Sequence, residues 1–200
     1  MHAILTKARF ASQAGYNAAW DYVEMPSQIL ENWVWDEKIL KKISGHYKTG
    51  ESLPSLLIDN MQKAKKFLSG YGVLRQVTFS LLDMDMHTNK VKGALNTYSS
   101  KLSKKITGIN GPLKSFHPAG FGHLAHGYDA GYYGYHWSEV FAQDMFTEFQ
   151  KKGLLNRAIG KKYREWILEK GSSMDEMELV KGFLGRKPNN KAFLRSIGVK

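Results

Sequence analysis

Apolar residues recur every three or four positions along most of the chain, which is the spacing of one face of an α-helix. The pattern predicts helices in five segments: 53–68, 73–87, 133–152, 156–170 and 173–184. A shorter and weaker pattern predicts a helix over 97–106, and the closing PNNKAFLRSIG predicts a last short helix or turn. Glycine and proline are dense over 107–127, which predicts a loop. We therefore expect an all-α fold in one unit, with any β structure confined to the stretch before residue 127.

The spacing also predicts which side of each helix is buried. Segment 53–68 places five apolar residues on one face: Leu53, Leu57, Met61, Ala64 and Leu68. In segment 73–87 the repeating positions are Val73, Val77, Leu81 and Met84. We expect both faces to pack against other helices.

Segment 133–152 carries the longest apolar stripe. Its members are Trp137, Val140 or Phe141, Met145 and Phe149, and the opposite face carries Asp144 and Glu148. We assign Trp137, Phe141 and Phe146 to the core, and Gly153 is a natural end for the helix.

Segment 173–184 is expected to begin with a capping box. Ser173 stands three residues before Glu176, which is the spacing at which the two residues can cap each other's backbone. Met177, Val180 and Leu184 are expected to face inward.

The composition narrows the class of protein without identifying it. The chain has 200 residues, 42% of them hydrophobic, and a formal net charge of +11, which favours anionic partners. The basic residues are scattered and no nucleic-acid motif accompanies them, so we expect neither a nucleic-acid nor a membrane partner. The chain has no Cys, which excludes disulfides and suits a cytoplasmic location. Residues 1–20 match a mitochondrial targeting helix only weakly.

The first unusual stretch is acidic and lies at residues 20–33, WDYVEMPSQILENW. If it is helical, one face carries Asp21, Glu24, Gln28 and Glu31. Pro26 is comfortable only in a first turn, so the regular helix should begin near Val23 or Glu24. This face could simply be exposed to solvent. The large apolar neighbours instead suggest a covered helix, in which a buried carboxylate requires a metal ion or a base.

The second unusual stretch is residues 120–137, GFGHLAHGYDAGYYGYHW, which contains four Tyr and five Gly. Aromatic residues used only for packing follow a helix or strand period and seldom lie among glycines, which lose conformational freedom on folding. The stretch is therefore expected to line a site. Tyr133 is the member that we assign to packing.

Taken together, DYVEMPSQILENWVWD and GHLAHGYDAGYYGYHWSEVFAQDMF resemble the zinc oligopeptidase family of thimet oligopeptidase, neurolysin and oligopeptidase A. The opening HAILTKARFASQAG and the closing PNNKAFLRSIG resemble the C-terminal portion of the same family. The resemblance covers essentially the whole chain. It implies that residues 1–200 are the C-terminal, all-α part of a zincin-type catalytic domain.

The resemblance implies an incomplete metal site. DYVEMPSQ matches the motif that supplies the family's third zinc ligand, which here is Glu24. Glu31 lies seven residues later on the same helix face and could either accept a hydrogen bond from a metal-bound histidine or be a plain surface carboxylate. The other two ligands belong to a His-Glu-x-x-His helix, in which the Glu acts as general base. No two His of this sequence are four residues apart, and His2 is expected to be an ordinary helix residue. The motif would lie just before Met1, so we expect the chain alone to be inactive.

The resemblance also implies roles for the tyrosine-rich stretch. Tyr128 and Tyr135 match tyrosines that stabilise the transition state, because a neutral phenol can donate a hydrogen bond to an oxyanion. His123 and Tyr132 match residues that contact the substrate, and Gly127 lets the backbone approach it.

The expected function is hydrolysis of short peptides by zinc-activated water. The expected partners are peptide substrates and the N-terminal part of the same enzyme. Two alternatives remain open. One is a non-catalytic peptide-binding module derived from the peptidase, and the other, suggested by charge alone, is a basic helical nucleic-acid binder.

Overall fold

The computed structural model describes residues 1–88, 90–112 and 116–199, and every regular element within these ranges is helical. The α-helices are α1 (His2–Leu5), α2 (Met25–Glu31), α3 (Glu37–Ile43), α4 (Ser55–Lys66), α5 (Ser69–His87), α6 (Leu95–Thr107), α7 (His117–Gly120), α8 (Gly134–Lys152), α9 (Arg157–Tyr163), α10 (Glu176–Leu184) and α11 (Lys191–Ser196). Shorter helical turns are η1 (Ala11–Gln13), η2 (Asn32–Trp35), η4 (Gly122–Leu124) and η5 (Arg164–Leu168). The expected all-α fold is confirmed.

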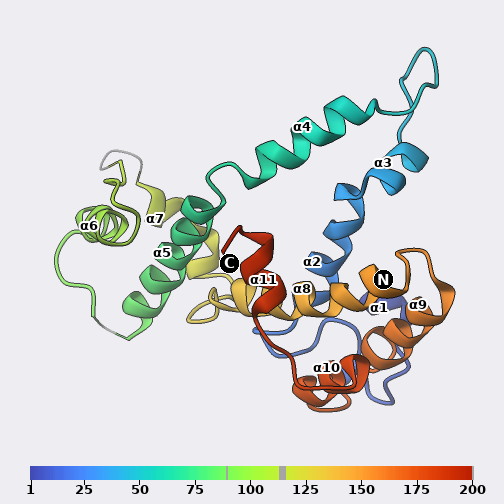
Figure 1. Ribbon diagram of the computed structural model, residues 1–200. Helices are drawn as coiled ribbons and strands as arrows, with labels where there is room; N and C mark the ends of the chain where they lie inside the picture. The colour runs from blue at the N-terminus through green and yellow to red at the C-terminus, as the bar shows by residue number, and fades with distance from the viewer. Residues whose placement is uncertain (89, 113–115, 200) are drawn as a thin grey trace.

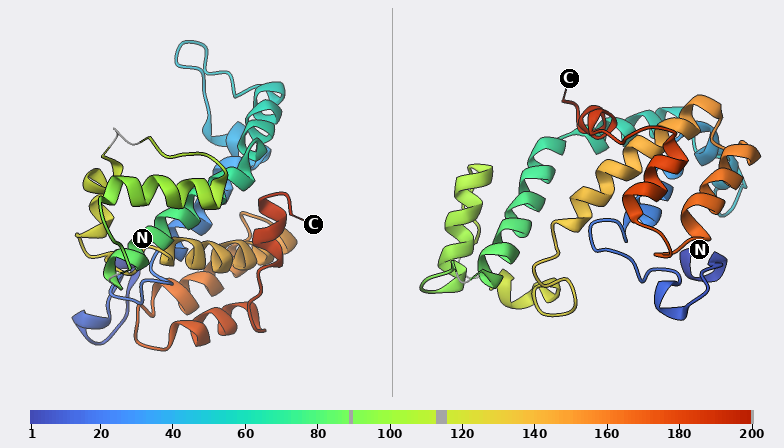
Figure 2. Two further views of the ribbon diagram at one scale, coloured as in Figure 1. Left: turned by 90° about the vertical axis from the view of Figure 1, so that its left-hand side faces the viewer. Right: turned by 90° about the horizontal axis from the view of Figure 1, so that it is seen from below.

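Helix α8 is the axis of the larger part of the molecule (Figure 1). Helices α2, α10 and α11 pack against it, and α10 also packs against η5. At the other end of the molecule α5 pairs with α6, and the two views of Figure 2 show these helices side by side. Helix α4 connects α5 to the loop above α3 and stands clear of the main body (Figure 1). The first turn of α8 therefore lies between the two ends of the molecule.

The core lies between α2, α8, α9, η5 and α10. Its buried apolar side chains include Met25 and Ile29 from α2, Met145 from α8, and Val180 and Phe183 from α10. Full burial of such a side chain stabilises the fold by about 1.5–3 kcal/mol. This core fixes α2 against α8, and these are the two helices that begin beside the acidic and the tyrosine-rich stretches.

Helix α8 has the boundaries predicted for segment 133–152, but some of the side chains assigned to its core are exposed. It ends at Gly153, whose φ of +99° favours glycine, and Phe141 and Phe146 are buried as expected. Trp137 is 54% exposed and Tyr133 is 41% exposed, so assigning both to packing was wrong. The inward positions of the first turns are instead Gly134 and Ser138, and the lack of a side chain at Gly134 lets α8 approach the backbone of Trp20.

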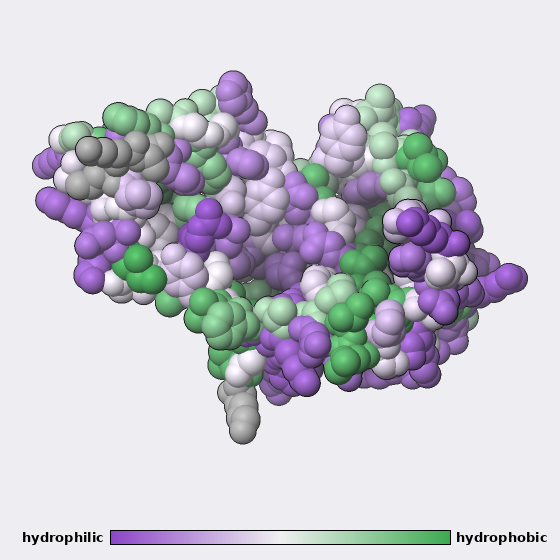
Figure 3. All heavy atoms as spheres, turned by 90° about the horizontal axis from the view of Figure 1, so that it is seen from above, coloured by the Kyte–Doolittle hydropathy of each residue, from purple (hydrophilic) through white to green (hydrophobic). Residues whose placement is uncertain are grey.

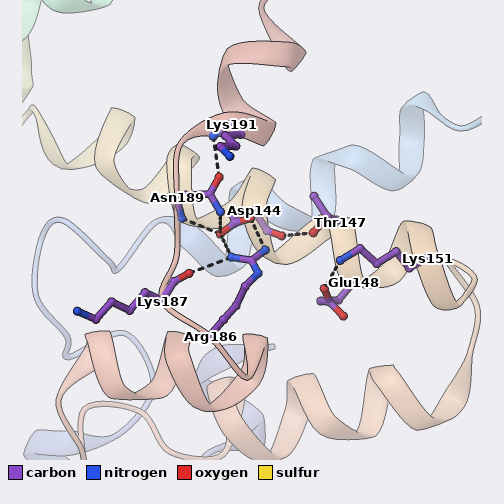
Figure 4. A network of polar contacts seen from close by, with 8 residues as sticks. All are labelled: Asp144, Thr147, Glu148, Lys151, Arg186, Lys187, Asn189 and Lys191. Carbon is purple, nitrogen blue, oxygen red and sulfur yellow. Dashed lines mark hydrogen bonds and ion pairs between the residues drawn. The ribbon is translucent and has the colours of Figure 1, made fainter.

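Asp144 contradicts the expected outer face of α8, because it is only 2% exposed (Figure 4). The guanidinium of Arg186 donates two hydrogen bonds of 2.7 Å to its carboxylate. The backbone N–H of Asn189 donates a third, at 2.9 Å. A buried carboxylate is tolerated when it is paired in this way. The network ties the segment after α10 to α8, and thereby holds α11 against α8.

Helix α10 begins at Glu176, three residues after the start of the predicted segment. Asp175 is the residue before it, and its side chain accepts a hydrogen bond of 3.1 Å from the backbone N–H of Glu178. The predicted cap at Ser173 was therefore wrong. Val180 and Leu184 are buried as predicted, whereas Met177 is exposed.

Helices α4 and α5 confirm the predicted segments but not the predicted buried faces. Leu57, Met61 and Leu68 of segment 53–68 are exposed, and the buried residue of α4 is Ile58. The break between the helices is made by Leu68, whose φ is +55°. Along α5 the buried residues are Thr78, Leu82 and Asp83, whereas Leu81 and Met84 are partly exposed. The inward face is displaced by one residue because α5 packs against α6 and the tyrosine-rich stretch.

The predicted loop over 107–127 contains two short helical turns, α7 and η4. Residues 113–115 of that loop lie outside the described residues. In the part of the chain that the structure describes, no helix combines the length and apolar character needed to cross a membrane.

Candidate active site

Glu24 and Tyr128 meet although they lie 104 residues apart in the sequence. Glu24 directly precedes α2, where Pro26 occupies the first turn as predicted. The Tyr128 hydroxyl donates a hydrogen bond to Glu24 Oε1, and Ser27 Oγ donates one of 3.2 Å to Glu24 Oε2. Both oxygens of this carboxylate are therefore held in place.

Tyr128 lies between two other aromatic rings. Its ring centroid is 4.5 Å from that of Trp20, and it stacks on Tyr135 with centroids 5.1 Å apart and an interplanar angle of 16°. Burial, with further contributions from Glu24 and Tyr135, raises the pKa of Tyr128 well above its ordinary value. The phenol consequently stays protonated at neutral pH and remains a hydrogen-bond donor.

His123, Tyr132 and Tyr135 form the neighbouring group. The Tyr135 hydroxyl lies 3.2 Å from His123 Nε2, and the Tyr132 hydroxyl donates a hydrogen bond of 2.8 Å to Gln76 Oε1 on α5. The His123 ring contacts Tyr128, Tyr132 and Tyr135 edge to face. Burial raises the pKa of Tyr132 and of Tyr135, so these phenols are also neutral donors near pH 7.

The backbone around these rings is held by close contacts. Gly134 begins α8 directly against the carbonyl of Trp20, where a Cβ atom would lie only 2.2 Å from the oxygen. Gln28 Nε2 donates a hydrogen bond of 3.0 Å to the carbonyl of Tyr135. Gly127 has a φ of +87°, a left-handed conformation that glycine adopts without strain. These contacts fix the start of α8 to α2.

The candidate residues border two cavities. Glu24 and Tyr128 line one of about 800 Å³, together with Met1, His2 and apolar residues of α2. His123, Tyr132 and Tyr135 line a second of about 1030 Å³, which extends along α4, α5, α8 and α11. Figure 3 shows one face of the molecule hollowed between its two ends. Either cavity is large enough for several residues of a peptide.

The expected zinc site is not complete within this chain. Among residues 1–88, 90–112 and 116–199, no three His, Cys, Asp or Glu side chains are grouped so that they could hold a metal ion. Glu31 is exposed at the far end of α2, seven residues from Glu24 and thus roughly 10 Å farther along the helix axis. His2 lies in α1, as expected of an ordinary helix residue, and is buried. Of the expected zinc ligands, the described residues supply one, the carboxylate of Glu24.

Asp83 and Gln76 contact the tyrosine-rich stretch and were not identified from the sequence. Gln28 was placed on the acidic face, but its contact with Tyr135 was not predicted. Asp83 is fully buried and accepts hydrogen bonds of 3.0 Å from the backbone N–H groups of Ala130 and Tyr132. The one signal that could have indicated it is its position inside the apolar run LLDMDM, where a carboxylate needs a specific partner.

Glu139 of α8 lines the larger cavity, and burial raises its pKa above the ordinary 4.5. A raised pKa means that the folded state favours the protonated carboxyl. This stabilisation is present below the ordinary pKa and is lost as the pH rises through the folded pKa. We therefore expect Glu139→Gln to raise the melting temperature at pH 7 and to have little effect at pH 4. Thermal unfolding at the two pH values measures this, and a larger gain at pH 4 would contradict it.

The fold and these contacts define a class: an all-helical unit in which neutral phenols and a carboxylate converge beside cavities of peptide size. The model of Peptidase family M3 matches residues 1–199, and the chain belongs to this family.

Several curated peptidases are similar to the chain over most or all of its length. It is 40% identical to oligopeptidase A of Salmonella typhimurium over 206 residues, covering 100% of this chain and 30% of that enzyme. It is 42% identical to saccharolysin of Saccharomyces cerevisiae over 184 residues, covering 90% of this chain and 26% of saccharolysin. A dipeptidyl carboxypeptidase of Escherichia coli is 30% identical over 204 residues, covering 100% of this chain and 30% of its own length. The chain thus spans less than a third of each of these relatives.

Proposed function

We propose that this chain forms one side of the active site of an oligopeptidase that hydrolyses short peptides. The observation that carries the proposal is the contact between the Tyr128 phenol and the Glu24 carboxylate at the edge of a cavity of peptide size. The names of the similar enzymes, oligopeptidase A and saccharolysin, support the substrate class. The Cys-free composition supports a cytoplasmic location.

In this proposal Tyr128 and Tyr135 act as donors to the carbonyl oxygen of the scissile peptide bond. That oxygen gains negative charge as the carbon becomes tetrahedral, and a phenol O–H close to it can stabilise the charge. The Tyr128 hydroxyl, which donates to Glu24 in the structure, would turn its hydrogen from that carboxylate to the substrate oxygen. The stacked rings and raised pKa values of Tyr128 and Tyr135 support this role. His123, hydrogen-bonded to Tyr135, and Tyr132 contact the substrate, and Gly127 lets the loop backbone lie close to it.

Zinc is the proposed cofactor, and it would supply an activated water molecule. Glu24 is the residue of this chain that we propose as a ligand, with Glu31 as a possible acceptor for a ligating histidine. Since one carboxylate does not make a zinc site, the remaining ligands and the general base must come from residues outside this chain. We accordingly propose that the 200-residue chain is inactive by itself.

The test is a chimera in which this chain replaces the matching segment of Salmonella typhimurium oligopeptidase A. We expect the chimera to bind zinc and to cleave a quenched fluorescent peptide. Glu24→Ala should remove zinc, measured by elemental analysis, and abolish cleavage, whereas Glu31→Ala should retain zinc. Retention of one zinc ion by the Glu24→Ala chimera would overturn the assignment of Glu24.

A peptide-binding module without catalysis is the second candidate function. It is favoured by two cavities of peptide size that are bordered by the tyrosine rings. It predicts that the 200-residue chain binds short peptides in the absence of zinc, and that Tyr128→Phe with Tyr135→Phe weakens the binding. Calorimetry that detects no peptide binding to the chain would exclude it.

A further inference from the structure

The segment that carries the catalytic tyrosines contains a strained turn. The N–H of Gly131 donates a hydrogen bond of 2.8 Å to the carbonyl of Tyr128, which closes a tight turn over Asp129 and Ala130. Ala130 has a φ of +56°, and this left-handed conformation costs an alanine about 1–2 kcal/mol. The turn lies among glycines, so its own sequence does little to hold this conformation. Something outside the turn must stabilise it.

The contact that does so comes from Asp83 of α5. Asp83 Oδ1 accepts the N–H of Ala130 and Oδ2 accepts the N–H of Tyr132, each at 3.0 Å. One carboxylate thus holds the strained residue and the residue two positions beyond it. Hydrogen bonds from backbone N–H groups to a charged carboxylate are stronger than those between neutral groups.

The position of Asp83 in α5 is unfavourable for the stability of that helix. It has 0% exposed surface, and it lies one turn from the C-terminal end of α5, where the helix dipole disfavours a negative charge. The Nδ1 atom of His87 lies 2.8 Å from the backbone carbonyl oxygen of Asp83 and 3.0 Å from Asp83 Oδ1. A buried carboxylate at this position is thus explained by the loop that it holds and not by the stability of α5.

Helix α5 is itself a firm support for this contact. The Tyr98 hydroxyl of α6 donates a hydrogen bond of 2.6 Å to Asp85 Oδ2. Gln76, seven residues before Asp83 and on the same face of α5, accepts the hydroxyl of Tyr132 at 2.8 Å. Helix α5 therefore holds both the backbone and the side chain of Tyr132.

We propose that Asp83 is the positioning residue of the tyrosine loop: its buried carboxylate fixes the turn at 128–131, and thereby places Tyr128 beside Glu24 and Tyr132 beside His123. The proposal rests on the proposed peptidase function. Asp83 contacts the backbone of Ala130 and Tyr132 and acts through the loop that these two residues belong to. A displacement of about 1 Å at such donors can lower a rate by about 100-fold.

The test compares Asp83→Asn with Asp59→Asn, the same change at an exposed aspartate of α4. Asparagine keeps the size of Asp83 and one acceptor oxygen, but its NH₂ group would face one of the two loop N–H donors. In the chimera, Asp83→Asn should lower kcat by about 10- to 100-fold and leave KM within about twofold. Asp59→Asn should leave both constants close to those of the parent.

A second readout does not depend on activity. Hydrogen exchange in the 200-residue chain should show at least tenfold faster exchange of the Ala130 and Tyr132 amides in Asp83→Asn, with the α10 amides unchanged. Unchanged exchange at these two amides, or a fall in kcat that only follows the loss of folded protein, would overturn the proposal. If the parent chimera is inactive but the Ala130 and Tyr132 amides of Asp83→Asn exchange faster, the peptidase function would be rejected. The role of Asp83 in holding the loop would still be supported.

Discussion

Tyr128→Phe is expected to lower kcat/KM of the chimera for a short peptide by about 10²–10³-fold, the usual cost of removing one oxyanion donor. The substitution deletes one hydroxyl and keeps the ring that stacks on Tyr135 and contacts Trp20. The folded structure should therefore be retained, and the loss should fall mainly on kcat. Steady-state kinetics with a quenched fluorescent peptide measures it.

Tyr47→Phe is the matched control, because it deletes the same hydroxyl from a side chain that is 84% exposed. We expect Tyr47→Phe to leave kcat/KM unchanged. If Tyr128→Phe raised KM and left kcat intact, the hydroxyl would contribute only to substrate binding, and the role of Tyr128 in the transition state would be rejected.

Gly134→Ala is expected to destabilise the protein by about 3 kcal/mol, at the upper end of the usual cost of overpacking. The added Cβ would lie 2.2 Å from the Trp20 carbonyl oxygen and 2.8 Å from its carbon, and backbone atoms cannot turn away as a side chain can. Helix α8 would have to move away from the segment before α2. That movement would separate Tyr128 and Tyr135 from Glu24, so catalysis should fail as well. Chemical denaturation measures the free energy of unfolding.

Gly160→Ala is the control for this change. Gly160 lies inside α9, and a Cβ there meets no atom within 4 Å. Alanine at this position should stabilise the protein by about 0.5–1 kcal/mol, because it loses less conformational freedom than glycine. Equal effects of the two substitutions would show that the contact between Gly134 and Trp20 is not tight.

The helical segments could be predicted from the sequence because their apolar spacing is long and regular, as in α8. The buried faces were less predictable. Trp137 belongs to the apolar stripe by spacing but is exposed, because the face of α8 that turns inward at this end carries Gly134, which lies against the Trp20 backbone. Asp144 was expected on the outer face, but its partner Arg186 follows a different helix. Helical periodicity describes one element and carries no information about its partners.

The candidate site, like the fold, was predicted in part from the sequence. Two unusual stretches and a family resemblance indicated Glu24, Tyr128, Tyr135 and His123, and the structure brings these residues together. Their roles remain proposals. Asp83 was not indicated, because a single carboxylate in an apolar run looks the same whether it anchors a loop or occupies an exposed face. The distinction lies in a contact between residues 47 positions apart, which the one-dimensional pattern does not contain.

If this chain supplies one side of a peptidase active site, its chimera with Salmonella typhimurium oligopeptidase A should cleave a quenched fluorescent peptide. We expect this cleavage to be lost in Glu24→Ala, and we expect no cleavage by the 200-residue chain alone. A chimera that folds and retains zinc but leaves the peptide intact would show that the chain does not supply this side of the site.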